Sequence, residues 1–252
     1  MNSLLAGKTG VVFGVANQRS IAWAVAEKAN EQGAKVIIGV QNDRMGEAAA
    51  KLIEGKPNFS LVTVDLNNDD QLAAVTKDLP NLDFAVHSVA YALREDLAGR
   101  FIETGREGFK VALETSAFTF VAMAKALEPK LNDDASLITM SYLGSQRVLP
   151  GYNVMGVAKA AIEASARYLA YDLGGRGIRV NVVSPGPINT VAARGIKGFT
   201  DILNTIGDKV PLKRPAEQEQ VALTSLYLLS DLSRGVSGQT IYVDSGYSIM
   251  GL

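Results

Sequence analysis

The strongest constraint on the fold is a regular alternation, along the whole chain, between short apolar runs and longer amphipathic stretches. The short runs predict buried strands, and the stretches between them carry the spacing of amphipathic helices. The predicted strands are 9–15, 35–40, 59–66, 82–88, 136–142, 178–184 and 241–244. The predicted helices are 20–33, 43–54, 68–79, 106–130, 152–173 and 216–230. We therefore expect an α/β fold with a mostly parallel sheet of about seven strands and helices on both faces.

The composition is that of an ordinary globular protein of 252 residues, with 47% hydrophobic and 20% charged residues. That length suits one large domain, and no repeat or linker divides it, so we expect a single domain over residues 1–252. The 25 Lys and Arg residues balance 26 Asp and Glu residues, which leaves no basic field for nucleic acid. Because the chain has no cysteine, disulfides, thiolate metal sites and a cysteine nucleophile are excluded, and we expect no metal.

The first residues, MNSLLAGKTGVVFGVANQRS, do not have the layout of a secretory signal, because a lysine and glycines interrupt a short apolar run. No apolar stretch approaches the roughly 18 residues that span a bilayer. We therefore expect a cytoplasmic protein without a membrane segment.

In open parallel sheets, ligands bind beyond the carboxyl ends of the strands. Gly14 follows the first predicted strand, and Ser20 and Ile21 open the next helix. Glycine permits a tight turn, and a helix N-terminus offers free N–H groups to a phosphate. The full G-x-G-x-x-G pattern is missing, however. From the residues alone, a nucleotide loop and a plain β–α turn are both open.

The ends of the next strands carry further polar candidates. Gln41 stands where an acid often holds the adenosine ribose, so NADH and NADPH are both open, and we interpret Arg44 as a solvated charge. Asp65 is either an acceptor for adenine or a helix N-cap. After the fourth strand, Ser88 begins a small-residue segment that lets the backbone pass close to a cofactor. His87 is the only histidine, and we interpret it as structural.

The segment SYLGSQRVLPGYNVMGVAK, residues 141–159, contains two tyrosines and a lysine. Tyr152 and Lys159 are seven positions apart, which on one helix means a rotation of only about 20° and a rise of about 10 Å. Gly156 occupies the position four after the tyrosine, where a lysine would lie about 6 Å along the helix. From spacing alone, a catalytic pair and a packed tyrosine with a solvated lysine are equally open.

With these segments together, the chain resembles a short-chain dehydrogenase/reductase, and within that superfamily the enoyl-[acyl-carrier-protein] reductases of bacterial type II fatty acid synthesis. The resemblance runs nearly end to end. The segments that carry it are GVANQRSIAWAVA, QND, VHSVAYA, REGFKVA, FVAMAKA, SYLGSQRVLPGYNVMGVAKAAIEASARYLA, GIRVNVVSPGPINTVAARGIKGF and VSGQTIYVDSGYSIMG.

The resemblance implies a single-domain, Rossmann-type, doubly wound parallel sheet. It implies an oxidoreductase that reduces the trans-2 double bond of enoyl thioesters on acyl carrier protein, the last step of fatty acid elongation. NADH is the expected cofactor and NADPH the alternative. A short-chain carbonyl reductase or alcohol dehydrogenase is a second reading, and a non-catalytic NAD(P)-binding regulator a third. The intact tyrosine–lysine pair and its spacing favour the first.

The resemblance also assigns residues. The implied catalytic residues are Tyr142, Tyr152 and Lys159. The implied cofactor-binding residues are Gly14, Ser20, Ile21, Gln41, Asp65, Leu66, Ser88, Val89, Lys159, Ile188, Asn189, Thr190, Val191 and Ala192. The implied substrate-binding residues are Ala92, Met155, Ile196 and Phe199, the last two in a mobile lid near 191–210.

The resemblance implies two partners. The first is acidic acyl carrier protein, which basic residues near the lid would steer. Thr200 and Asp201 stand where the family often has two basic residues, so carrier affinity is less well supported than the chemistry. The second partner is further copies of the chain, because the family is usually a homotetramer. Small residues in 152–173 suit close helix packing between subunits or within one.

Overall fold

The structure is a computed structural model that describes residues 3–189 and 205–251. Its described strands form one seven-stranded sheet in the order β3-β2-β1-β4-β5-β6-β7, with every neighbouring pair parallel. The strands are β1 Thr9–Phe13, β2 Lys35–Val40, β3 Phe59–Thr63, β4 Leu82–His87, β5 Leu131–Met140, β6 Arg179–Pro185 and β7 Thr240–Val243.

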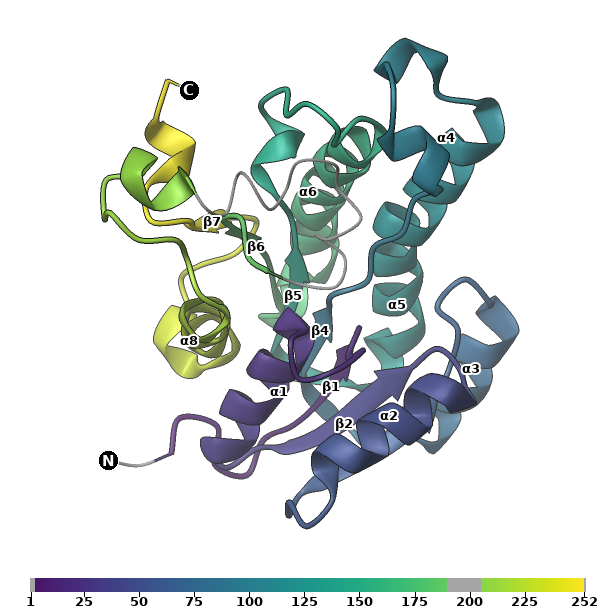
Figure 1. Cartoon of the computed structure of the whole chain (residues 1–252). Helices are drawn as coiled ribbons and strands as arrows, with labels where there is room; N and C mark the ends of the chain where they lie inside the picture. Colours follow the sequence, from purple (N-terminus) through teal and green to yellow (C-terminus); the bar gives the residue numbers. More distant parts are fainter. Residues whose placement is uncertain (1–2, 190–204, 252) are drawn as a thin grey trace.

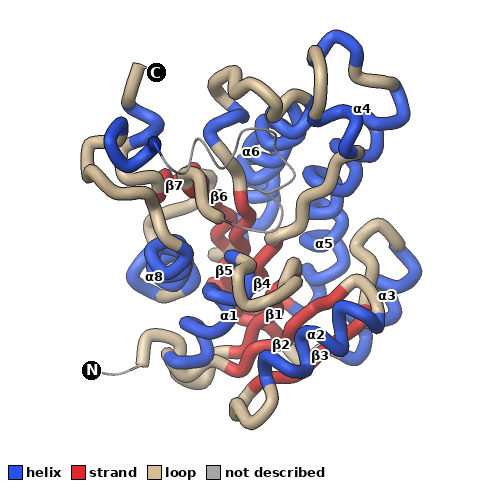
Figure 2. The backbone as a smooth tube through the Cα atoms, viewed as in Figure 1, coloured by secondary structure: helices blue, strands red, loops and turns tan. Residues whose placement is uncertain are grey.

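Helices cover both faces of the sheet, which forms the central layer (Figures 1 and 2). The α-helices are α1 Ile21–Glu31, α2 Asp43–Ile53, α3 Asp69–Asp78, α4 Arg106–Leu113, α5 Thr119–Leu127, α6 Val154–Leu173 and α8 Gln218–Leu229. One apolar core lies beneath α1, α2 and α8, and a second lies beneath α3, α5 and α6. The predicted fold class is therefore confirmed. No helix in the described ranges is long and apolar enough to cross a membrane.

The long helix predicted over 106–130 is interrupted. A π-helical turn, Glu114–Phe118, separates α4 from α5. Thr119 Oγ1, at the start of α5, donates to the Thr115 carbonyl at 2.7 Å, and Ser116 Oγ in the turn contacts both the N–H and the carbonyl of Tyr91 at 2.9 Å. Side-chain hydroxyls that bond to backbone groups compete with the regular helix ladder, and π-helical turns often occur at functional sites.

Several strand ends also differ from the prediction. β1 ends at Phe13 because Gly14 turns the chain with a φ of +101°. β5 begins at Leu131, earlier than predicted, and ends at Met140, so Ser141 and Tyr142 leave the sheet at its carboxyl edge. These ends decide which side chains face the ligand side of the sheet.

The chain changes direction across the sheet between β1 and β4. Strands β2 and β3 extend to one side of β1, and β4 to β7 extend to the other. A crevice forms at such a switch point, beyond the carboxyl ends of the strands. Here the loops after β1 and β4 pass very close, because a Cβ on Gly14 would lie 2.1 Å from the Ser88 carbonyl oxygen. Glycine is therefore required at position 14 for the crevice to have this shape.

Gly10 gives a direct test of how β1 packs in the core. A Cβ on this residue would lie 2.2 Å from the ring of Phe84, which is fully buried. We expect Gly10→Ala to lower the free energy of unfolding by about 1–3 kcal/mol, because the ring must move within a packed core. Gly174→Ala is the matched control, since nothing lies within 4 Å of its added Cβ and its φ is −62°. Equal thermal midpoints for the two variants would contradict this packing.

Candidate active site

A cleft of about 1170 Å³ lies along the carboxyl edge of the sheet and is lined from the ends of β1, β2, β4, β5 and β6 and from α6. Most of the residues predicted from the sequence meet in it. Those that line it are Gly14, Ser20, Ile21, Gln41, Asp65, Leu66, Ser88, Val89, Ala92, Tyr142, Tyr152, Met155, Lys159 and Ile188. Asn189 is exposed and is not among the lining residues. Thr190, Val191, Ala192, Ile196 and Phe199 lie outside the described residues.

The loop after β1 is shaped by Ser20, which precedes α1. Ser20 holds the N-cap position of α1, but its side chain makes no capping hydrogen bond. Instead, Ser20 Oγ accepts from the N–H groups of Ala16 and Asn17, at 3.2 and 3.1 Å, and donates to the Asn17 carbonyl. The hydroxyl therefore holds the loop in a tight turn at the positive end of α1. A helix end of this kind favours a bound phosphate.

At the far end of the cleft, Gln41 Nε2 donates to Asp65 Oδ2 at 3.1 Å. Asp65 also accepts from the backbone and side-chain N–H groups of Asn67, both at 3.0 Å. Burial alone would raise the pKa of Asp65, but these hydrogen bonds outweigh it and leave the pKa below its usual value. The helix-cap alternative for Asp65 is wrong, because Asn68 caps α3 by accepting from the Gln71 N–H.

The two tyrosines lie together at the other end of the cleft. The rings of Tyr142 and Tyr152 have centroids 5.0 Å apart and meet edge to face at 66°. Tyr152 is 8% exposed and Lys159 is 6% exposed. The Lys159 ammonium donates to the Met140 carbonyl at 2.8 Å. The lysine is thus a buried cation at the end of β5, and the solvated alternative for it is wrong.

The positions of Tyr152 and Lys159 in the cleft differ from the prediction that both lie on one helix. Helix α6 begins at Val154, and Asn153 before it has a φ of +41°, so Tyr152 lies in the preceding turn and not on the helix. Tyr152 and Lys159 therefore do not share one helical face, and this prediction was wrong. Tyr152 is held in position by the close approach of the backbone at Gly144 to the start of α6. A Cβ on Gly156 would lie 2.6 Å from the Gly144 carbonyl, and one on Gly144 would lie 2.4 Å from the Tyr152 ring.

Burial controls the charge of these side chains. It raises the pKa of Tyr152, with a further contribution from Tyr142, and it raises the pKa of Tyr142, with a contribution from Tyr247. Both phenols therefore keep their protons at neutral pH and can donate hydrogen bonds. Burial lowers the pKa of Lys159 to about 8, and the negative charge of Glu163 opposes this shift.

His87 is fully buried in β4 and does not line the cleft. Its two ring nitrogens lie 2.9 Å from the hydroxyl oxygens of Thr139 and Thr119. Burial, and then the charge of Lys159, lowers the pKa of His87 to about 3, so the ring is neutral. The structural interpretation of this histidine agrees with that environment.

Sequence reasoning missed the residues that the π-helical turn places in the cleft. Thr115 lines it, and Ser116 Oγ, beneath it, lies 3.7 Å from the sulfur of Met155. The signal in the sequence was the group of Thr115, Ser116 and Thr119 inside an otherwise helical segment. Such hydroxyls near the middle of a helix mark a possible break in its ladder.

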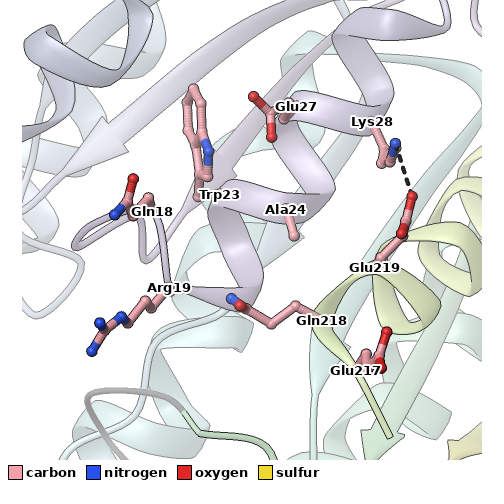
Figure 3. A pocket seen from close by; sticks show the side chains of 9 residues that line it. All are labelled: Gln18, Arg19, Trp23, Ala24, Glu27, Lys28, Glu217, Gln218 and Glu219. Carbon is pink, nitrogen blue, oxygen red and sulfur yellow. Dashed lines mark ion pairs between the residues drawn. The ribbon is translucent and has the colours of Figure 1, made fainter.

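A second depression, of about 660 Å³, lies between α1 and α8 (Figure 3). Its lining is mostly polar or charged, and the Lys28–Glu219 ion pair, with an N–O distance of 3.1 Å, bridges the two helices. Trp23 is the only aromatic residue in that lining, whereas the cleft at the sheet edge has a long apolar wall. Apolar lining with a few convergent polar groups is typical of cofactor sites. Within the described ranges, no group of three or more His, Asp or Glu residues could hold a metal ion.

Comparison with known proteins points to one family. The family model described as enoyl-(acyl carrier protein) reductase matches residues 14–248. The enoyl-[acyl-carrier-protein] reductase [NADH] FabI of Bacillus cereus is 44% identical over 255 residues, covering 98% of this chain and 99% of that protein. The corresponding [NADPH] FabI of Staphylococcus aureus strain MRSA252 is 43% identical over 249 residues, covering 96% of this chain and 97% of that protein.

Solved structures show the same relationship. The Bacillus cereus enoyl-acyl carrier protein reductase, solved with NADP+ and indole naphthyridinone, superposes with a TM-score of 0.96 at 44% identity and covers 99% of both chains. The enzyme of Anaplasma phagocytophilum, solved with NAD, has a TM-score of 0.95 at 39% identity and covers 100% of this chain and 98% of the other. With its cleft, its paired tyrosines and its buried lysine, this chain belongs to the enoyl-(acyl carrier protein) reductase family.

Proposed function

We propose that this protein is an NAD(P)H-dependent reductase of the trans-2 double bond in enoyl thioesters of acyl carrier protein, acting in the last step of fatty acid elongation. One observation carries the proposal: neutral Tyr152, in contact with Tyr142, lies in the same cleft as buried Lys159. The full-length match to reductases that use NADH or NADPH supports it.

The residues of the cleft fit a dinucleotide. The close approach of Gly14 to Ser88 leaves no room for a side chain between the two loops, so a pyrophosphate meets bare backbone and the N-terminus of α1. Gly14, Ser20 and Ile21 would hold the pyrophosphate, and Gln41, Asp65 and Leu66 the adenosine. The residues proposed for the nicotinamide half are Ser88, Val89, Lys159, Ile188, Asn189, Thr190, Val191 and Ala192.

A bound reduced nicotinamide would supply a hydride to C3 of the enoyl thioester. Negative charge would then develop on the thioester oxygen, the Tyr152 hydroxyl would donate a hydrogen bond to that oxygen, and C2 would take up a proton from solvent. A preorganised donor at a developing oxyanion contributes about 3–4 kcal/mol to transition-state stabilisation. Tyr142, whose ring meets Tyr152 edge to face, holds the phenol in place. The Lys159 ammonium donates a hydrogen bond to the Met140 carbonyl in this structure, and it would bind the nicotinamide ribose when the cofactor is present.

The acyl chain would enter past Ala92 and Met155, which line the cleft. A mobile lid near 191–210, with Ile196 and Phe199 against the chain, stays a prediction from the family resemblance. Lys209, near the end of this segment, and Lys213 and Arg214, just after it, are exposed. We propose that they attract the acidic carrier protein in the cytoplasm.

The reaction is tested by following loss of reduced-nicotinamide absorbance with a trans-2-enoyl thioester. We expect turnover, with kcat/KM about tenfold or more higher for NADH than for NADPH, because the Asp65 carboxylate beside Gln41 repels a ribose 2′-phosphate. A 3-ketoacyl thioester is the control substrate. Turnover of the ketoacyl compound alone would indicate a carbonyl reductase, and no turnover with either cofactor would refute the proposal.

The role of Tyr152 is tested by Tyr152→Phe. We expect kcat to fall by about 10²–10³-fold, because the oxyanion loses its donor, while NADH still binds. Tyr227→Phe is the matched control, since Tyr227 lies on α8, is 38% exposed and does not line the cleft. If the two variants keep the same kcat, Tyr152 has no part in stabilising the oxygen.

We also propose a homotetramer. Helix α6 exposes two large apolar side chains, Tyr168 at 75% and Tyr171 at 86%, and Phe118, in the turn packed against α6, is 56% exposed. Ala166, one of the small residues of this helix, is buried inside the chain, so the large side chains are the better candidates for subunit contact.

Light scattering after gel filtration tests the assembly. We expect about four times the mass of one chain for the wild type, and smaller species for the Tyr168→Asp, Tyr171→Asp double variant, because each aspartate places a charge in the contact. Ile102→Asp is the control, as Ile102 is 78% exposed and lies in a short 3-10 helix outside α6. A wild-type monomer would contradict the tetramer.

A further inference from the structure

We propose that Glu163 is a positioning residue of the reductase site: its buried carboxylate binds the segment that carries Tyr142 to the helix that carries Lys159. The effect on catalysis rests on the proposed function, but the contacts themselves do not. Glu163 is 6% exposed and does not line the cleft, so it acts through its neighbours and not on the substrate.

Glu163 accepts two short hydrogen bonds. Glu163 Oε1 accepts from Ser141 Oγ at 2.5 Å and from Ser145 Oγ at 2.6 Å. Bonds of this length are typical of hydroxyl groups that donate to a charged carboxylate. The two serines lie on either side of Tyr142 in the sequence, so one oxygen of Glu163 holds both ends of the segment that presents this tyrosine.

Lys159 lies one turn before Glu163 on α6 and bonds to the neighbouring residue of the same segment. Residues four apart on a helix lie on the same side, so Lys159 and Glu163 face the end of β5 together. Lys159 donates to the carbonyl of Met140, and Glu163 accepts from the side chain of Ser141, the next residue. Opposite charges on one helix thus hold two consecutive residues at the point where the strand leaves the sheet.

The negative charge of Glu163 also acts on Lys159. No ion pair among the described residues includes Glu163, so its charge is balanced at longer range. The titratable groups near it are Lys159 on α6 and Tyr242 on β7. Lys159 is in turn near His87 on β4, which is neutral, and Tyr152 lines the same cleft. The buried carboxylate is therefore the group that favours the ammonium form of Lys159.

Glu163→Gln removes the negative charge but keeps the size of the side chain, and its amide oxygen can still accept hydrogen bonds from the two serines. Without the negative charge, burial lowers the pKa of Lys159 further below about 8. The ammonium is then lost at a lower pH. We expect the alkaline fall in NADH affinity, followed by fluorescence, to move down by about one pH unit. The alkaline fall in kcat/KM should move with it.

Two variants complete the design. Asp172→Asn removes an exposed carboxylate from the same helix and should leave both pH profiles unchanged. Ser145→Ala removes one hydrogen bond but keeps the charge. We expect it to lower kcat about tenfold, because small misplacements of catalytic groups are costly, without moving the alkaline fall.

The proposal is overturned if Glu163→Gln and Asp172→Asn have the same pH profiles, or if Glu163→Gln lowers only the thermal midpoint. If Glu163→Gln does not fold, an unchanged kcat in Ser145→Ala overturns it and a lowered kcat with retained NADH binding supports it. The NADH titration needs no thioester. A wild-type chain that binds NADH but reduces nothing would refute the proposed function while the shifted binding profile still supported Glu163.

Discussion

The site depends on one contact between two backbones. The segment that carries Tyr142 passes so close to the start of α6 that a Cβ on Gly156 would lie 2.6 Å from the Gly144 carbonyl. A side chain at Gly144 would push against the Tyr152 ring, and a side chain at Gly156 would force the loop and the helix apart. That separation would break the edge-to-face contact of Tyr142 with Tyr152 and withdraw the serines from Glu163. The positions of the phenols and of the buried charge therefore follow from a glycine pair that takes no part in the chemistry.

Burial then sets the protonation of the two tyrosines, Lys159 and His87 around this contact. It keeps the tyrosines protonated, so they can donate hydrogen bonds, and it weakens the hold of Lys159 on its proton. His87 is kept neutral between two threonines. Lys159 is thus the buried cation at the end of the cleft where the proposed reaction takes place. A low local dielectric strengthens the interaction of such a charge with an anionic transition state.

The regular elements were largely predictable, because burial on a parallel sheet produces long apolar runs that local pattern reveals. All seven strands were expected, although β5 begins earlier and ends earlier than its apolar run suggested. The helix expected over 106–130 is broken at Glu114–Phe118, since hydroxyls there bond to neighbouring backbone. Tyr152 precedes α6, because Asn153 takes a left-handed φ that the residue pattern did not announce.

By itself, the sequence determined the fold class, the family and the identity of 14 residues that line the cleft. These depend on local hydrophobic pattern and on motifs that are contiguous in the chain. The tertiary structure alone decided where Tyr152 lies relative to α6, why Gly156 must be a glycine and what Glu163 contacts. Each of these involves atoms that only packing brings together, as when Ser141 and Glu163 meet across 22 positions of the chain. Distances between such atoms are set by close packing of the whole domain, which no local pattern encodes.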